Sequence, residues 1–118
     1  KGDLYVFQDG DALEVYDVSG LPSSAPSFVA AVPLSSLATP PNETPCQIEC
    51  HREGWVLNDL SGRYVYVGDS GDVVSTSTNS VVANLPALDN TRVMVEIDWQ
   101  NGAPSGTSTH FGLGRVTN

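Results

Sequence analysis

The fold of this chain is decided by residues 54–88, GWVLNDLSGRYVYVGDSGDVVSTSTNSVVANLPAL. Short runs of alternating residues are separated here by turn-forming Gly, Ser, Asp and Asn. This pattern predicts one antiparallel meander of four strands. The predicted strands are residues 55–58, 64–67, 72–76 and 80–85.

Both faces of the predicted meander are largely apolar. Tyr64 and Tyr66 point to one side of their strand, and Val65 and Val67 point to the other. A sheet that is apolar on both faces needs a covering layer on each, as when similar sheets stack around an axis.

The first 34 residues repeat the central pattern. Residues 3–7 match 63–67, residues 14–17 match 72–75, and residues 27–33 match 80–86. Three matched strands in the same order indicate an internal repeat whose first unit lacks its first strand. The strands predicted in this unit are residues 4–7, 13–18 and 28–32.

The rest of the chain predicts two further strands and no helix. Residues 93–99 alternate as a strand, a polar loop follows at 100–109, and a last strand is expected near 111–116. The predicted strands therefore number three, four and two in successive units, and the fold class is all-β.

Residues 61–67 (SGRYVYV) and 71–83 (GDVVSTSTNSVVA) resemble the YVTN-type repeats of seven-bladed β-propellers. A spacing of about 40 residues between Trp55 and Val95, which open successive units, fits such blades. The resemblance implies a partial blade, an insertion rich in Pro and Ser with both cysteines, a complete four-stranded blade and a partial closing blade. These parts are residues 1–34, 35–53, 54–88 and 89–118.

About two blades and a further partial blade cannot close a ring. The resemblance therefore implies the C-terminal part of a propeller, whose remaining blades come from another chain, a cleaved fragment or further copies. The abrupt start on a strand also favours a processed terminus or a downstream portion of a longer polypeptide. The alternative fold is a compact β-sandwich.

The charge of the chain excludes some partners. There are 5 Lys and Arg residues against 14 Asp and Glu residues, and the formal net charge is −9. Such a surface repels nucleic acids and anionic membranes. No apolar run is long enough to span a bilayer.

Weak signals favour an extracellular protein. Asn42 opens an N-glycosylation sequon, and Cys46 and Cys50 are the only cysteines. We expect these cysteines to form a local disulfide, while pairing with cysteines of another chain stays open. The second alternative is a partial zinc site with His51, Glu49 and Glu53, which falls short of the four ligands that structural zinc prefers.

Two turns contain pairs of carboxylates that could bind calcium, but in neither turn are the acidic residues spaced as in a calcium-binding loop. They contain Asp9 and Asp11, and Asp69 and Asp72, and ordinary tight turns explain both. No metal or cofactor is therefore predicted. Residues 68–71, GDSG, match part of a serine-protease motif, but the next residue departs from it and a turn is favoured.

One rim of the predicted blades collects loops, and loops commonly carry binding sites. The ligand-binding candidates on that rim are His51, Arg52, Asp69, Asn90 and Arg92, with Ser70, Glu53 and Asp89 beside them. Asn58 and His110 are expected towards the opposite face.

Two classes of function follow. The first is a ligand-binding or assembly scaffold with a glycan as one candidate ligand. The second is part of a carbohydrate-active enzyme, a lyase or a hydrolase, that shares its pocket with other blades. In a lyase, His51 would act as base and Arg52 or Arg92 would neutralise a uronate carboxylate. No catalytic residue is assigned.

Overall fold

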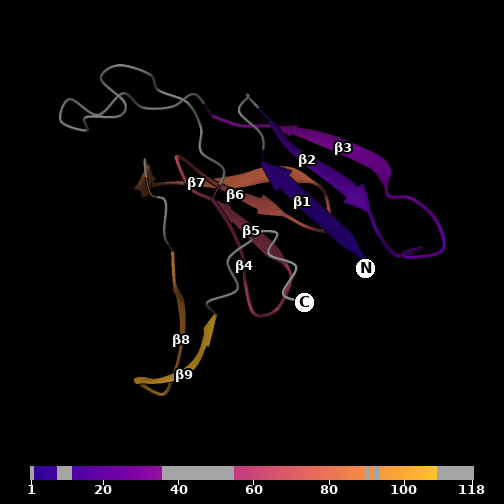
Figure 1. Ribbon diagram of the computed structural model, residues 1–118. Coiled ribbons are helices and arrows are strands. Elements are labelled where there is room, and N and C mark those ends of the chain that lie inside the picture. The colour runs from indigo at the N-terminus through magenta and orange to yellow at the C-terminus, as the bar shows by residue number, and fades with distance from the viewer. Residues whose placement is uncertain (1, 8–11, 36–54, 90, 92–93, 109–118) are drawn as a thin grey trace.

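The computed structural model describes residues 2–7, 12–35, 55–89, 91 and 94–108, and within these ranges the chain forms only strands and turns. The strands make three separate antiparallel sheets of three, four and two strands (Figure 1). Within the described residues, the prediction of an all-β chain is confirmed, and the first two predicted units form sheets of three and four strands.

Strand order follows the sequence in every sheet, as expected for meanders. The three-stranded sheet contains β1 (Asp3–Phe7), β2 (Ala12–Asp17) and β3 (Ser27–Pro33). The four-stranded sheet contains β4 (Val56–Asn58), β5 (Tyr64–Val67), β6 (Ser70–Ser75) and β7 (Ser80–Asp89). The last sheet is the hairpin of β8 (Glu96–Gln100) and β9 (Ala103–Ser108).

The predicted loop at residues 100–109 is wrong, because Ala103–Ser108 forms β9. This segment, APSGTS, lacks apolar alternation and contains Pro and Gly, so its strand conformation depends on pairing with β8. The strand expected near residues 111–116 lies outside the described ranges.

The two larger sheets lie face to face and share one hydrophobic core. Its fully buried members are Leu13, Val15 and Val32 from the three-stranded sheet and Val65, Val67 and Val74 from the four-stranded sheet. Burial of each such side chain stabilises the fold by about 1.5 to 3 kcal/mol, so this core holds the two sheets together.

Both sheets carry a β-bulge at the same place in the repeat. One bulge interrupts the pairing of β3 at Val29, opposite Val15 and Tyr16 of β2. The other interrupts the pairing of β7 at Val82, opposite the two valines of β6. Because a bulge needs an extra residue at one defined position, this agreement supports the repeat independently of sequence similarity.

The bulges fix which residues correspond, and they correct one predicted match. Val15 corresponds to Val73, as the sequence alignment has it. Val15 pairs with Tyr5, whereas Val73 pairs with Tyr66. Tyr5 therefore corresponds to Tyr66 rather than to Val65, so the match of residues 3–7 with 63–67 was off by one residue.

The two sheets meet through faces that do not correspond to each other. Val15 lies in the shared core, but its counterpart Val73 lies on the opposite face of the four-stranded sheet, next to Tyr66. Val74 lies in the core, but its counterpart Tyr16 lies on the outer face of the three-stranded sheet. The sheets are thus stacked head to tail, each presenting the same face in the same direction.

The expectation that both faces of the meander are covered holds only for its inner strands. Every residue of β6 is buried, whereas β7 is exposed over most of its length. The hairpin β8–β9 is set apart from the two larger sheets (Figure 1). It contacts the four-stranded sheet through Glu96, whose side chain accepts a hydrogen bond from the backbone nitrogen of Leu60.

Candidate functional site

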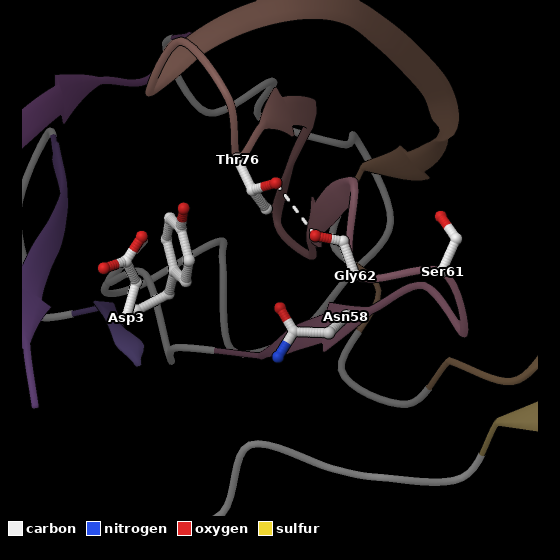
Figure 2. Close-up of a pocket in the computed structure, with 6 residues that line it drawn as sticks. Asp3, Asn58, Ser61, Gly62 and Thr76 are labelled. Atoms are coloured by element: carbon white, nitrogen blue, oxygen red, sulfur yellow. Dashed lines mark hydrogen bonds between the residues drawn. The ribbon is translucent and has the colours of Figure 1, made fainter. Parts of the chain in front are cut away.

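A cavity of about 440 Å³ opens between the two larger sheets, near the turns that join β4 to β5 and β6 to β7. The side chain of Asp3 comes from one sheet, and that of Asn58 projects from the other, across the cavity (Figure 2). The residues that line this cavity, named the inter-sheet cleft below, are Asp3, Tyr5, Asn58, Ser61, Gly62 and Thr76.

The turn between β4 and β5 forms one wall of the inter-sheet cleft, and Asp59 organises it. The Asp59 carboxylate accepts hydrogen bonds from the backbone nitrogen of Tyr64, at 2.9 Å, and from the hydroxyl of Ser61. Burial alone would raise the pKa of Asp59, but these hydrogen bonds outweigh it and lower the pKa. The Thr76 hydroxyl donates to the carbonyl of Gly62 at 2.8 Å and ties the two turns together.

Strand β1 forms the other wall, and Tyr5 links it to the four-stranded sheet. The Tyr5 hydroxyl donates a hydrogen bond to Oδ1 of Asn79 at 2.9 Å. Burial, together with the nearby charge of Asp3, raises the pKa of Tyr5, so its phenol stays protonated near neutral pH. The inter-sheet cleft therefore combines an aromatic side chain with a carboxylate, an amide and hydroxyls.

The opposite end of the four-stranded sheet holds the predicted rim. Asp69 pairs with Asp89 through an isolated parallel bridge, so the structure brings together two residues that were assigned to this rim. Asp69 is only 1 % exposed and has a φ of 63°, which places it inside a tight turn. Asn58 lies towards the other end, as predicted, and there it lines the inter-sheet cleft.

The remaining candidates lie outside the described residues, and their roles stay predictions. They are His51, Arg52, Asn90 and Arg92 for the ligand, Cys46 and Cys50 for the disulfide, and Asn42 for the glycan, together with Glu49, Glu53, Asp9, Asp11 and His110.

Asp72 has a structural role that the sequence did not reveal. Its carboxylate accepts hydrogen bonds from the backbone nitrogen of Ser35 at 2.6 Å, from the Ser35 hydroxyl at 2.8 Å and from the Asn84 amide at 2.9 Å. Burial by itself would raise the pKa of Asp72, but these hydrogen bonds outweigh it and lower the pKa. Asp72 is fully buried and joins β6, β7 and the end of β3.

Ser70, the serine of the GDSG motif, directly follows the tight turn at Asp69 and is the first residue of β6. It is almost fully buried, its backbone nitrogen donates to the carbonyl of Gly68 at 2.7 Å, and its hydroxyl accepts a hydrogen bond from the backbone of Asp72. These contacts agree with the interpretation of the motif as a turn. Within the described part of the chain, acidic, histidine and cysteine side chains form no group of three or more that could hold a metal ion.

Comparisons of the chain with models of known protein families, with characterised proteins and with solved structures found no match. The described residues contain no helix long and apolar enough to cross a membrane.

Proposed function

We propose that the chain is a segment of a β-propeller-type scaffold, in which consecutive sheets are blades and the inter-sheet cleft binds a ligand. The observation that carries this proposal is the head-to-tail stacking of two sheets that share a bulge. Units that present the same face in the same direction stack in series around an axis, with further blades at each end. The YVTN-type sequence resemblance supports the same architecture.

The alternative β-sandwich fits the exposed side chains less well. A closed sandwich buries its two inner faces against each other and leaves polar outer faces. Here the outer face of the three-stranded sheet carries Phe28, 60 % exposed, and Leu4, 48 % exposed. Apolar side chains on that face favour a further layer, which a propeller provides and a two-layer sandwich does not.

A neutral saccharide is the ligand that the inter-sheet cleft fits best. Sugar hydroxyls both donate and accept hydrogen bonds, and the cleft offers the Asp3 carboxylate as acceptor and the Asn58 amide as donor and acceptor. The Tyr5 ring adds an apolar surface of the kind that packs on a sugar ring. The net charge of −9 disfavours anionic sugars.

The proposal is tested by titrating neutral oligosaccharides into the protein and recording amide shifts in NMR spectra. Shifts are expected to gather at Tyr5, Asn58 and Gly62. In Asn58→Ala, the loss of about one hydrogen bond, worth about 0.5 to 1.5 kcal/mol, weakens binding roughly threefold to tenfold. The matched control Asn101→Gly removes an amide from the distant β8–β9 turn, where glycine tolerates the positive φ, and leaves binding unchanged.

Two results would contradict the saccharide site. One is that no oligosaccharide of the panel shifts the residues of the inter-sheet cleft. The other is that Asn58→Ala binds as tightly as the wild type.

Secretion, glycosylation of Asn42 and a propeller completed by further blades belong to the same proposal. The sequon and the two cysteines support an extracellular location. The alternative function, a carbohydrate-active enzyme, depends on His51, Arg52 and Arg92, and no observation on the described residues favours it.

A further inference from the structure

An apolar sheet face lies at each end of the stack, and each of these faces has exposed apolar side chains. The outer face of the three-stranded sheet carries Leu4, Tyr16 and Phe28, and the rings of Tyr16 and Phe28 touch edge to face with centroids 5.7 Å apart. The far face of the four-stranded sheet carries Tyr66 and Leu85, together with Leu57 and Val73; Leu57 and Val73 are buried, and Leu85 is 42 % exposed. These surfaces are named the outer face and the far face below.

The internal repeat shows what each of these faces can pack against. On the outer face, Leu4 and Tyr16 correspond to Val65 and Val74, which in the four-stranded sheet are buried against the three-stranded sheet. The outer face therefore repeats the residue pattern of the face through which the four-stranded sheet packs on the three-stranded sheet.

The far face has the complementary pattern. Its residues Tyr66 and Leu85 correspond to Tyr5 and Val32, which in the three-stranded sheet pack on the four-stranded sheet. The outer face and the far face therefore repeat the two halves of one existing interface, and the chain carries both halves.

We propose that the outer face of one copy of this chain docks on the far face of a second copy, which continues the stack from molecule to molecule. This inference rests on the head-to-tail stacking in the proposed function and names the partner, a second copy. Such an interface is heterologous, so the copies form a closed ring or an open series rather than a two-fold dimer.

The shapes of the two faces agree with this docking. The outer face has Tyr16 where the four-stranded sheet has Val74, and Phe28 where it has Val81, so its side chains are larger. A hollow of about 230 Å³ lies between the far face and residues 94–96. The hollow is lined mainly by apolar side chains, namely Leu57, Tyr66, Leu85, Leu88, Met94 and Val95, with Glu96 at its edge. The Tyr16 and Phe28 rings of the second copy supply the volume that fills it.

The test compares the masses of the wild type and two charged variants by sedimentation velocity. Phe28→Asp damages only the outer face, and Leu85→Lys damages only the far face. The wild type is expected to form oligomers whose mass grows with concentration, and each variant alone is expected to be a monomer. Leu21→Asp, at an exposed leucine in the loop after β2, is the matched control and keeps the wild-type mass.

Mixing the two variants gives the decisive result. Each variant retains the face that the other lacks, so a mixture is expected to form a dimer containing one copy of each and nothing larger. A two-fold interface through the outer face alone predicts instead that Leu85→Lys associates by itself. Amide spectra confirm that both variants are folded, and Val95→Lys replaces Leu85→Lys if the latter is not.

A wild type that is monomeric at all concentrations, or variants that do not combine, would overturn the docking of copies. Saccharide binding separates this outcome from failure of the proposed function, because Phe28 and Leu85 lie outside the inter-sheet cleft. A monomer that binds a saccharide removes only the docking inference. An assembly that binds none removes only the saccharide site.

Discussion

The carboxylate of Asp72 lies 2.6 Å from the backbone nitrogen of Ser35, and this hydrogen bond joins β6 of the four-stranded sheet to the end of β3 in the three-stranded sheet. This hydrogen bond lies beside the shared hydrophobic core, at the ends of the strands that are away from the inter-sheet cleft. Because Asp72 is fully buried, the change in unfolding free energy when its carboxylate is replaced measures how much this contact stabilises the packing of the two sheets.

Asp72→Ala is expected to destabilise the fold by about 2 kcal/mol, because it removes the hydrogen bonds that Ser35 and Asn84 donate to a buried carboxylate, and a hydrogen bond to a charged group is worth about 1.5 to 3 kcal/mol. Urea unfolding followed by circular dichroism measures the change. Asp17→Ala, at an exposed carboxylate that bonds the backbone nitrogen of Ser19, is the control and costs less because water replaces the carboxylate. Equal costs for the two variants would contradict the role given to Asp72.

Stability should fall at acid pH through Asp72. Its pKa in the folded state is below the unfolded value of about 3.9, so the ionised carboxylate stabilises the fold above that value. This stabilisation is lost as the pH falls from about 5 through the lower folded pKa. Because Asp17 and Asp59 also have lowered pKa values, the informative quantity is the difference between the wild type and Asp72→Asn. A difference that does not change between neutral pH and about pH 3 would refute the assignment.

Gly71→Ala is expected to cost more stability than Gly62→Ala. Both glycines have a positive φ, 71° and 68°, which costs an alanine about 1 to 2 kcal/mol. At Gly71 the added Cβ would also lie 2.6 Å from a carboxylate oxygen of Asp89 and from the carbonyl of Leu85, whereas Gly62 has open space. Thermal unfolding of both variants measures the difference, and similar melting temperatures would show that the turn at Gly71 is less tightly packed than described.

Cys46 and Cys50 are expected to be bonded to each other, because four chain steps bring two cysteines within disulfide reach when the loop curls. Thiol counting under denaturing, non-reducing conditions should detect no free thiol, and the protein should run as one chain without reductant. Two free thiols would sink this prediction and revive a metal site.

Much of the fold was predictable because strands of period two leave a clear pattern. The alternation of Tyr64, Val65, Tyr66 and Val67 reappears as alternating partial and full burial in β5. The repeat was also visible, but its register in the first strand was not. Both faces of these strands are apolar, so a shift of the alignment by one residue still matches apolar residues with apolar residues. Only the pairing of Tyr66 with Val73 in the structure decides the register.

The inter-sheet cleft could not be predicted in full. Asp3, Asn58 and Thr76 are far apart in the sequence, and the way that the two sheets stack brings them together. Topology predicted the correct end of the four-stranded sheet for Asn58, but no local motif marks Asp3 or Tyr5 as its neighbours. The role of Asp72 as a buried acceptor was missed for the same reason, because its partner Ser35 follows the last strand of the other sheet.

Methyl NOEs in a solution NMR spectrum test whether the two repeated sheets stack head to tail. This stacking predicts NOEs from Val15 to valines of the shared core, Val65 and Val74, and none to Val73, its own counterpart in the repeat. NOEs from Val15 to Val73 or Tyr66 would mean that corresponding faces meet, and head-to-tail stacking would then be wrong.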